Sequence, residues 1–142
     1  MRIFLDTWVL VERYKGKQDA LNLLRAAKEK LEAHISHITI AELSNVISRE
    51  FGEREARIQY AYLKHSPLIK DGTSEETARN AGLYKTKYGF SLADAIILAT
   101  AVDLGAQVLV TGGEKQYEEE WKEVTEIKVM KLSDYIRTSS SS

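Results

Sequence analysis

Short apolar segments alternate with longer amphipathic segments along the chain, and this alternation sets the fold class. The expected strands cover residues 3–5, 33–38, 68–69, 107–111 and 127–130. The expected helices cover residues 19–31, 39–51, 53–64, 74–88, 91–104 and 114–122, and a final turn covers residues 133–137. Strands separated by helices form parallel sheets with helices on both faces. We therefore expect an α/β fold around a central parallel sheet of about five strands.

The length indicates a single domain, and the charge balance limits how the chain could bind a nucleic acid. In the 142 residues we expect one domain over residues 1–137 and a frayed, serine-rich tail over residues 138–142. The 20 Lys and Arg residues nearly balance the 21 Asp and Glu residues, so positive potential alone would not hold a nucleic acid. A nuclease is not excluded, because bound metal ions add positive charge at the site itself.

Composition also bears on the compartment. The chain has no cysteine, which excludes disulfides and thiolate metal ligands and fits a reducing cytoplasm. We see no signal peptide, and no apolar run approaches the roughly 18 residues of a membrane span. A cytoplasmic protein is therefore expected.

Three carboxylates, Asp6, Glu42 and Asp94, stand close to the ends of apolar segments. Ligands of open α/β sheets bind outside the carboxyl ends of the strands. Carboxylates gathered there raise one another's pKa values unless a cation shares the site. Oxygen ligands of this kind suit Mg²⁺ or Mn²⁺. The pattern therefore predicts a metal-dependent hydrolase that acts on phosphodiesters.

A purely structural interpretation of the same carboxylates stays open. Thr39 at an N-cap with Glu42 three residues later is a capping box, and Ser91 with Asp94 is a looser one. Asp6 follows a strand and suits the cap of the next helix. Residues 73–76 show the same pattern, and we assign them no chemistry. Position alone does not decide between a cap and a ligand.

Four segments, in order and at suitable spacing, carry a family resemblance. They are IFLDT at residues 3–7, ITIAEL at 38–43, LADAIILATA at 92–101 and VLVTG at 108–112. Together they resemble a PIN domain and, more narrowly, the VapC-type ribonuclease toxins of prokaryotes. The resemblance implies a three-layer PIN-like fold with an acidic pocket that binds Mg²⁺ or Mn²⁺ and an endoribonuclease that hydrolyses RNA phosphodiester bonds.

The resemblance also implies residue roles and partners. Asp6, Glu42 and Asp94 would be metal ligands, and the hydroxyls of Thr7 and Thr111 would orient a ligand or a water. We count Thr111 with the three acids as catalytic. Such a protein would be the toxin of a type II toxin–antitoxin pair, a homodimer, and the partner of an antitoxin protein whose C-terminal segment plugs the pocket. Helices 39–51 and 53–64 are candidate dimer surfaces.

The chain departs from the family at the fourth acidic position. Gly113 and Gln116 stand where similar proteins carry acids. Glu114 is a candidate metal ligand, because glycines at 112 and 113 permit unusual backbone angles, or else a first-turn residue that stabilises a helix dipole. Two alternatives follow: a catalytically weak module that binds RNA or a protein, and an RNA-processing nuclease that is not a toxin.

Other side chains are weaker candidates. His34 and His37 are three residues apart on an expected strand, so their side chains should point to opposite faces, and we expect no zinc site. Lys15 and Lys17 are candidates for contacts with phosphates, although such charges are more often simply solvated.

Overall fold

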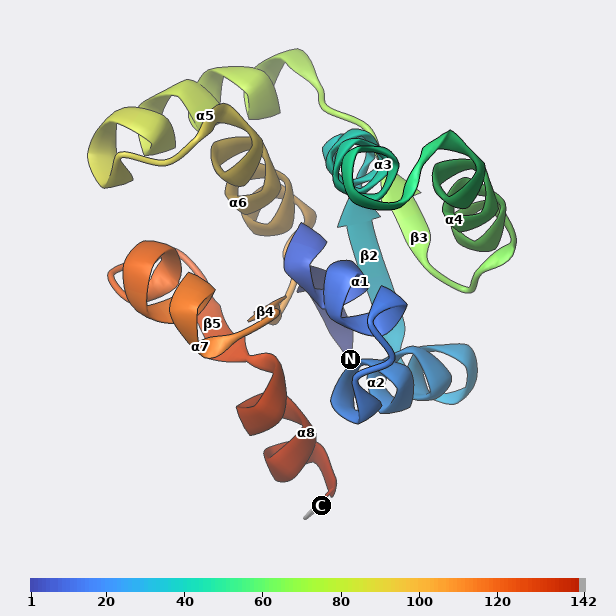
Figure 1. Cartoon of the computed structure of the whole chain (residues 1–142). Coiled ribbons are helices and arrows are strands. Elements are labelled where there is room, and N and C mark those ends of the chain that lie inside the picture. Colours follow the sequence, from blue (N-terminus) through green and yellow to red (C-terminus); the bar gives the residue numbers. More distant parts are fainter. Residues whose placement is uncertain (141–142) are drawn as a thin grey trace.

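A computed structural model describes residues 1–140 and shows a five-stranded sheet in which every neighbouring pair of strands is parallel. The strands stand in the order β3-β2-β1-β4-β5 (Figure 1). In chain order they are β1 (Arg2–Leu5), β2 (Glu32–Ser36), β3 (Ile69–Asp71), β4 (Val108–Thr111) and β5 (Lys128–Lys131). The parallel sheet expected from the sequence is confirmed.

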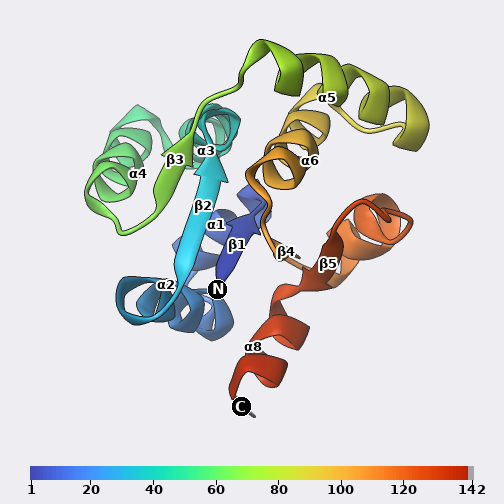
Figure 2. The same cartoon turned by 180° about the vertical axis from the view of Figure 1, so that it is seen from behind.

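Helices cover both faces of this sheet. They are α1 (Thr7–Tyr14), α2 (Gln18–Glu29), α3 (His37–Phe51), α4 (Glu53–His65), α5 (Glu75–Tyr88), α6 (Leu92–Leu104), α7 (Glu114–Gln116), the π-helix η1 (Tyr117–Trp121) and α8 (Leu132–Ser140). In Figure 1 α1 lies in front of β1, and in Figure 2, seen from behind, β1 and β2 lie in front of α1. The expected three-layer α/β architecture is confirmed.

Each face of the sheet carries its own apolar core, because strand side chains alternate between the faces. Ile3 and Leu5 pack with buried residues of α1, α2, α3, α4 and α8. Phe4 points the other way and packs with residues of α5 and α6 and with Trp121 of η1. Asp6 has an extended backbone, with φ −80° and ψ 169°. It therefore continues the alternation and belongs to the Phe4 face.

The order of the strands changes direction between β1 and β4. The chain continues from β1 to β2 and β3 on one side of β1, whereas β4 and β5 lie on its other side. Leu5 stands opposite Val110, and the Asp6 amide donates to the Val110 carbonyl at 3.1 Å. The carboxyl ends of β1 and β4 thus meet at a topological switch point, which is where open α/β sheets bind ligands. Asp6 and Thr111 are the residues at these two ends.

The turn after β4 lies very close to the start of α1. A Cβ atom on Gly112 would lie 2.6 Å from the Cβ of Trp8 and 2.7 Å from the Trp8 carbonyl carbon. Any side chain at position 112 would therefore force the backbone of α1 to move. Glycine at this position lets the first turn of α1 pack against the end of β4, which brings Asp6 next to Thr111.

We expect Gly112→Ala to lower the free energy of unfolding by about 1–3 kcal/mol, because the added methyl group overpacks this contact. Urea denaturation followed by circular dichroism measures the change. Gly82→Ala is the matched control, since a Cβ atom on Gly82 of α5 meets nothing within 4 Å. That change should raise the stability by about 0.5–1 kcal/mol, because alanine suits a helix better than glycine. A Gly112→Ala protein as stable as the parent would contradict the argument.

Several element boundaries differ from those expected. Helix α1 occupies residues 7–14, where no helix was expected. Strand β2 ends at Ser36 rather than at residue 38, because the Ser36 side chain accepts a hydrogen bond from the Ile38 amide. Helix α3 therefore begins at His37, two residues before Thr39. The expected helix at 114–122 divides into α7 and the π-helix η1.

The C-terminal segment is more helical than expected. The predicted turn at residues 133–137 is part of α8, which continues to Ser140. Residues 138–140 of the expected tail are therefore helical, and residues 141–142 lie outside the described residues. The division into a domain and a tail stays a prediction. Within residues 1–140, no helix is both long enough and apolar enough to cross a bilayer.

Candidate acidic metal site

Asp6 lies between the end of β1 and the beginning of α1. Its side chain accepts hydrogen bonds from the amides of Trp8 at 3.0 Å and Val9 at 3.3 Å, so it is the N-cap of α1. Only 2% of the residue is exposed. Burial, followed by repulsion from Asp94, raises the pKa of Asp6 well above its usual value, although the two amide donors act in the opposite direction. Asp6 therefore does cap α1. The cap also fixes its carboxyl group at the switch point, where ionisation of that group is unfavourable.

Glu42 lies in the second turn of α3 and is half-buried. The Thr7 hydroxyl donates to Glu42 Oε1 at 2.5 Å, and the buried Thr39 hydroxyl lies 3.1 Å from the Thr7 oxygen. The predicted capping box of Thr39 and Glu42 is wrong, because Ser36 is the N-cap of this helix. Burial raises the pKa of Glu42, the Thr7 hydrogen bond lowers it, and Asp94 raises it further. Glu42 therefore does not cap α3. Its carboxylate instead accepts a hydrogen bond from Thr7, the residue that directly follows Asp6.

We expect Thr7→Val to raise the pKa of Glu42, because the side-chain hydrogen bond that favours the ionised carboxylate is lost. Carbon-13 NMR titration of the Glu42 carboxyl group measures the change. Thr7→Ser keeps the hydroxyl and should leave this pKa near that of the parent protein. Equal pKa values in the valine and serine variants would show that Thr7 does not control Glu42.

Asp94 lies in the first turn of α6, and Ser91 is the N-cap that accepts a hydrogen bond from its amide at 3.2 Å. In this looser capping pattern the Ser91 side chain caps the helix, and it also forms a hydrogen bond with the Asp94 carboxyl group, which lowers the pKa of that group. Burial, followed by a hydrogen bond to Glu120, raises the pKa of Asp94 to about 7. Asp94 also raises the pKa values of Asp6 and Glu42. It is thus the acid that connects the group.

Glu120 is the acid that the sequence did not reveal. It is half-buried in η1, its side chain shares a hydrogen bond with Asp94, and its charge also raises the pKa of Asp6. The sequence offers three successive glutamates at 118–120 and no motif that selects one. Only the wide turn of η1, with Trp121 fully buried behind it, decides which of them faces the other acids.

Of the two remaining predicted site residues, Thr111 is buried and Glu114 is exposed. Thr111 is fully buried at the end of β4, and within the described part of the chain its hydroxyl oxygen has no hydrogen-bond partner. Strand alternation puts it on the same face as Leu109, and hence on the face of α6. The side chain of Glu114 is 70% exposed and forms a salt bridge with Lys131 at 2.8 Å. The structure therefore puts Thr111 on the same sheet face as Asp6, at the end of the neighbouring strand, and holds Glu114 at the surface.

The donor set fits a hard divalent cation. Asp6, Glu42, Asp94 and Glu120 offer only oxygen, which Mg²⁺ and Mn²⁺ prefer, and the unpaired Thr111 hydroxyl is a further oxygen that a bound ion or its water would satisfy. Across residues 1–140, no three His, Asp or Glu side chains yet stand close enough to enclose an ion. The hydrogen bond between Asp94 and Glu120 raises the pKa of Asp94, so a cation bound between the two carboxyl groups would compete with a proton there.

The family comparison agrees with this geometry. The family model of the PIN domain matches residues 3–121. The chain belongs to the PIN domain family. The matched segment contains all four carboxylates of the site. No curated protein matches the chain.

Solved structures share the fold of this PIN domain. A toxin–antitoxin complex from Klebsiella pneumoniae has a TM-score of 0.62 and 25% identity, over 89% of this chain and 98% of the other. DNA-bound VapBC from Salmonella typhimurium has a TM-score of 0.73 and 15% identity, over 93% and 98%. VapC20 from Mycobacterium tuberculosis, a sarcin-ricin loop cleaving toxin, has a TM-score of 0.61 and 18% identity, over 75% and 86%. The predicted resemblance to PIN domains and to the fold of VapC-type toxins is confirmed, and a nuclease is supported.

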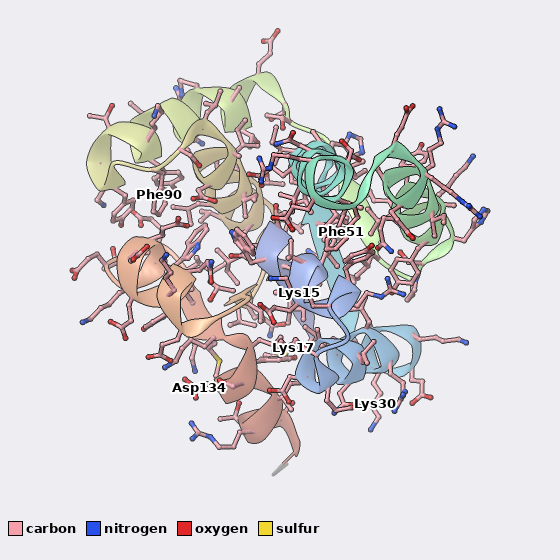
Figure 3. All side chains as sticks on the ribbon, in the orientation of Figure 1. Lys15, Lys17, Lys30, Phe51, Phe90 and Asp134 are labelled. Atoms are coloured by element: carbon pink, nitrogen blue, oxygen red, sulfur yellow. The ribbon has the colours of Figure 1, made fainter. Side chains whose placement is uncertain are left out.

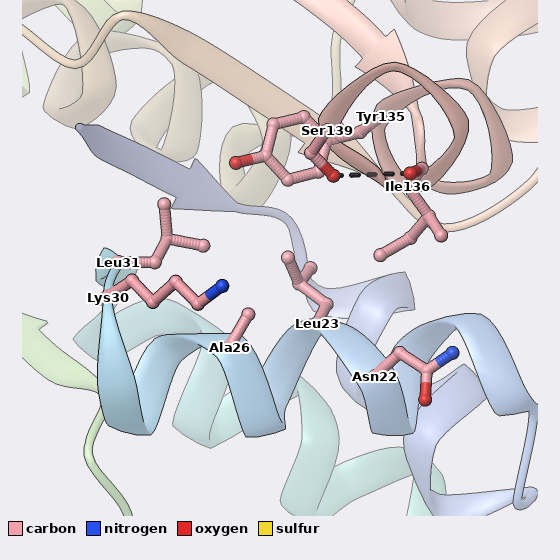
Figure 4. Close-up of a pocket in the computed structure, with 8 residues that line it drawn as sticks. All are labelled: Asn22, Leu23, Ala26, Lys30, Leu31, Tyr135, Ile136 and Ser139. Atoms are coloured by element: carbon pink, nitrogen blue, oxygen red, sulfur yellow. Dashed lines mark hydrogen bonds between the residues drawn. The ribbon is translucent and has the colours of Figure 1, made fainter. Parts of the chain in front are cut away.

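Two other features of the PIN domain lie away from the acids. A pocket of about 300 Å³ between α2 and α8 has a mainly apolar lining in which Lys30 is the only charged residue (Figure 4). Lys15 and Lys17 lie at the end of α1 that is remote from Asp6 (Figure 3). Neither feature contributes to the acidic site, and contacts of these lysines with phosphates stay a prediction.

The histidines also lie outside the site. His34 is buried in β2, with Nδ1 2.7 Å from Asp71 and Nε2 2.8 Å from Glu32. His37 is exposed and begins α3. The prediction that both histidines lie on one strand is therefore wrong for His37, because the strand ends at Ser36.

Proposed function

We propose that this PIN domain is an endoribonuclease that depends on Mg²⁺ or Mn²⁺ and hydrolyses RNA phosphodiester bonds. One observation carries the proposal: Asp6, Glu42 and Asp94 come from three separate elements to one switch point, where burial raises all three pKa values and the charge of Asp94 raises those of Asp6 and Glu42 further. Buried acids with strongly raised pKa values are typical of catalytic and binding sites. The family and the activity of the VapC20 toxin support the nuclease class.

The chain's own residues would divide the work as follows. Asp6, Glu42 and Asp94 would hold the ion, and Thr7 would keep Glu42 directed toward it. When bound, the ion supplies Lewis-acid stabilisation of charge on the phosphodiester oxygens. The buried hydroxyl of Thr111 would orient a water molecule, since it has no other partner among the described residues. Glu114 as a metal ligand would require its side chain to leave Lys131.

We further propose that the protein is the toxin of a type II toxin–antitoxin pair, acts in the cytoplasm and binds an antitoxin protein. The similar solved structures include a toxin–antitoxin complex and DNA-bound VapBC, which supports an antitoxin partner. A homodimer is also proposed, and the exposed Phe51, Ile58 and Tyr60 on α3 and α4 offer it apolar surface. Sedimentation that shows only monomer at high concentration would count against the dimer.

The deciding experiment is digestion of total cellular RNA with Mn²⁺ or Mg²⁺, followed by sequencing of the new ends. We expect discrete cuts with either ion and none after the metal is removed with EDTA, because the acids repel one another and the substrate without it. Cuts that persist in EDTA would contradict metal dependence. The map of ends would also identify the preferred RNA.

A catalytically weak module that binds RNA or a protein is the second candidate. It is favoured by Gly113, which leaves the expected fourth acidic position without a carboxylate. Such a module would bind Mn²⁺ weakly or not at all and would not cut RNA. A processing nuclease would cut RNA and would lack a neighbouring short reading frame for a DNA-binding antitoxin.

A further inference from the structure

The segment after β4 lacks acids at the two positions where the resemblance places them, and it carries its acids further on. Gly113 and Gln116 replace the expected carboxylates, and Glu114 is turned to Lys131. The next acids are the three glutamates of η1. Their surroundings differ: Glu118 pairs with Lys122 at 3.3 Å, Glu119 is exposed, and Glu120 is half-buried.

The π-helix determines which glutamate faces inward. Its wide turn is closed by the Lys122 amide, which donates to the Tyr117 carbonyl at 2.9 Å. Trp121 anchors the turn in the α6-side core, where its ring lies 5.0 Å from that of Phe90. With Trp121 fixed inside and Glu118 held outside by Lys122, the carboxylate that reaches Asp94 is that of Glu120. Single π-turns inside helices are frequent at functional sites.

In the part of the chain that the structure describes, Glu120 interacts with other acids rather than with a cation. Its side chain forms a hydrogen bond with the carboxyl group of Asp94, and its charge reaches Asp6, whose pKa it raises. Among residues 1–140, no Lys or Arg forms a salt bridge with any of these three acids. Buried acids in proteins are normally paired with a cation or a metal. The Thr111 hydroxyl is an independent sign of a ligand site, because it is fully buried, lies on the sheet face that α6 covers and has no hydrogen-bond partner in the described chain.

We infer that Glu120 supplies the fourth carboxylate of the metal site, in place of the acid absent at Gly113. The inference rests on the proposed metal-dependent function. On this view the fourth acid is not lost but stands seven residues later in the chain than the family pattern predicts. The wide turn of η1 brings its carboxylate back to Asp94. The site then keeps four carboxylates, and the weak-module alternative loses its main support.

Calorimetric titration of the metal-free full chain with Mn²⁺ tests the inference. Glu120→Gln should weaken Mn²⁺ binding by about 10- to 100-fold, and the glutamine should still accept the Asp94 hydrogen bond and preserve the fold. Glu119→Gln is the matched control, because it removes the same charge one residue away from an exposed position. It should bind Mn²⁺ like the parent. Thermal melts of both variants check that they fold.

A rescue variant sharpens the test. Gly113 has φ −140°, which any residue adopts, and an added Cβ atom would meet only the flexible end of Gln116 at 3.1 Å. Glu120→Gln combined with Gly113→Asp should therefore recover Mn²⁺ binding that Glu120→Gln alone loses. This recovery also excludes misfolding as the cause of the loss.

The outcomes separate the inference from the proposed function. Parent-like Mn²⁺ binding by Glu120→Gln would overturn the role of Glu120 and leave the nuclease proposal standing. A parent protein that binds Mn²⁺ through Glu120 and cuts no RNA would support the inference and overturn the nuclease. A parent protein that binds no Mn²⁺ would overturn both.

Discussion

Asp6→Asn is expected to abolish RNA cleavage while making the metal-free protein more stable. The carboxylate is lost from the centre of the site, so cleavage should fall by at least about 100-fold, as expected for a direct ligand when even outer partners have effects of 10- to 100-fold. Cleavage is measured as the rate of new RNA ends at saturating Mn²⁺. A variant that cuts at a rate close to that of the parent would refute the assignment of Asp6.

The gain in stability has a separate cause. Asparagine is as good an N-cap as aspartate, so the hydrogen bonds from Trp8 and Val9 should persist. The variant also removes an ionisable group whose raised pKa makes its charged form unfavourable in the fold. Urea denaturation at about pH 8 in EDTA measures the difference. Asp19→Asn serves as the control, because Asp19 lies in the first turn of α2 and outside the acidic site.

The second large effect expected is a metal stabilisation that depends strongly on pH. The pKa of Asp94 is about 7 in the fold against 3.8 in the unfolded chain. The folded state therefore holds the proton more tightly, and the metal-free protein should lose stability as the pH rises from about 4 through about 7. If Mn²⁺ is held by Asp94, it would compete with that proton for the carboxyl group. At about pH 8 and 100 times its Kd, Mn²⁺ should add about 2.7 kcal/mol, and at about pH 5.5 much less.

Melting temperatures with Mn²⁺ and with EDTA at the two pH values measure this prediction. Asp94→Asn should reduce the loss of stability with rising pH and remove most of the metal stabilisation, because one titrating group and its repulsion of Asp6 and Glu42 are gone while the burial of those two acids remains. Glu119→Gln, which changes an exposed acid of the same region, should keep both. A metal stabilisation that is equal at the two pH values would contradict the displacement of a proton by the ion.

The sequence predicted the architecture well where apolar periodicity is strong, and less well where short-range contacts decide. The five strands and most helices follow from buried runs such as that of β4. Helix α1 did not, because its apolar residues form one continuous run after Asp6 rather than a one-sided stripe. The start of α3 was misplaced because Ser36 and Thr39 are both good N-caps, and only the packed structure shows that Ser36 accepts the amide.

The site was predictable in part for a similar reason. Asp6, Glu42 and Asp94 stand at the ends of recognisable elements, so the topology alone brings them together. Glu120 lies in a π-turn, and the sequence carries no signal that distinguishes this turn from an ordinary α-helical one. Glu114 was nearer to the expected position in the sequence, but the cation of Lys131 holds its side chain at the surface.

The central place of β1 has a consequence for the synthesis of the chain on the ribosome. β1 is made first, yet one of its two partners is β4, which is made after more than two thirds of the chain. Until β4 emerges, one edge of β1 is unpaired and its apolar residues have no partner on that side. Two of the site's residues, Thr111 and Glu120, also emerge late. An interrupted translation product that stops before β4 therefore contains Asp6, Glu42 and Asp94 but lacks the strand that pairs with the carboxyl end of β1.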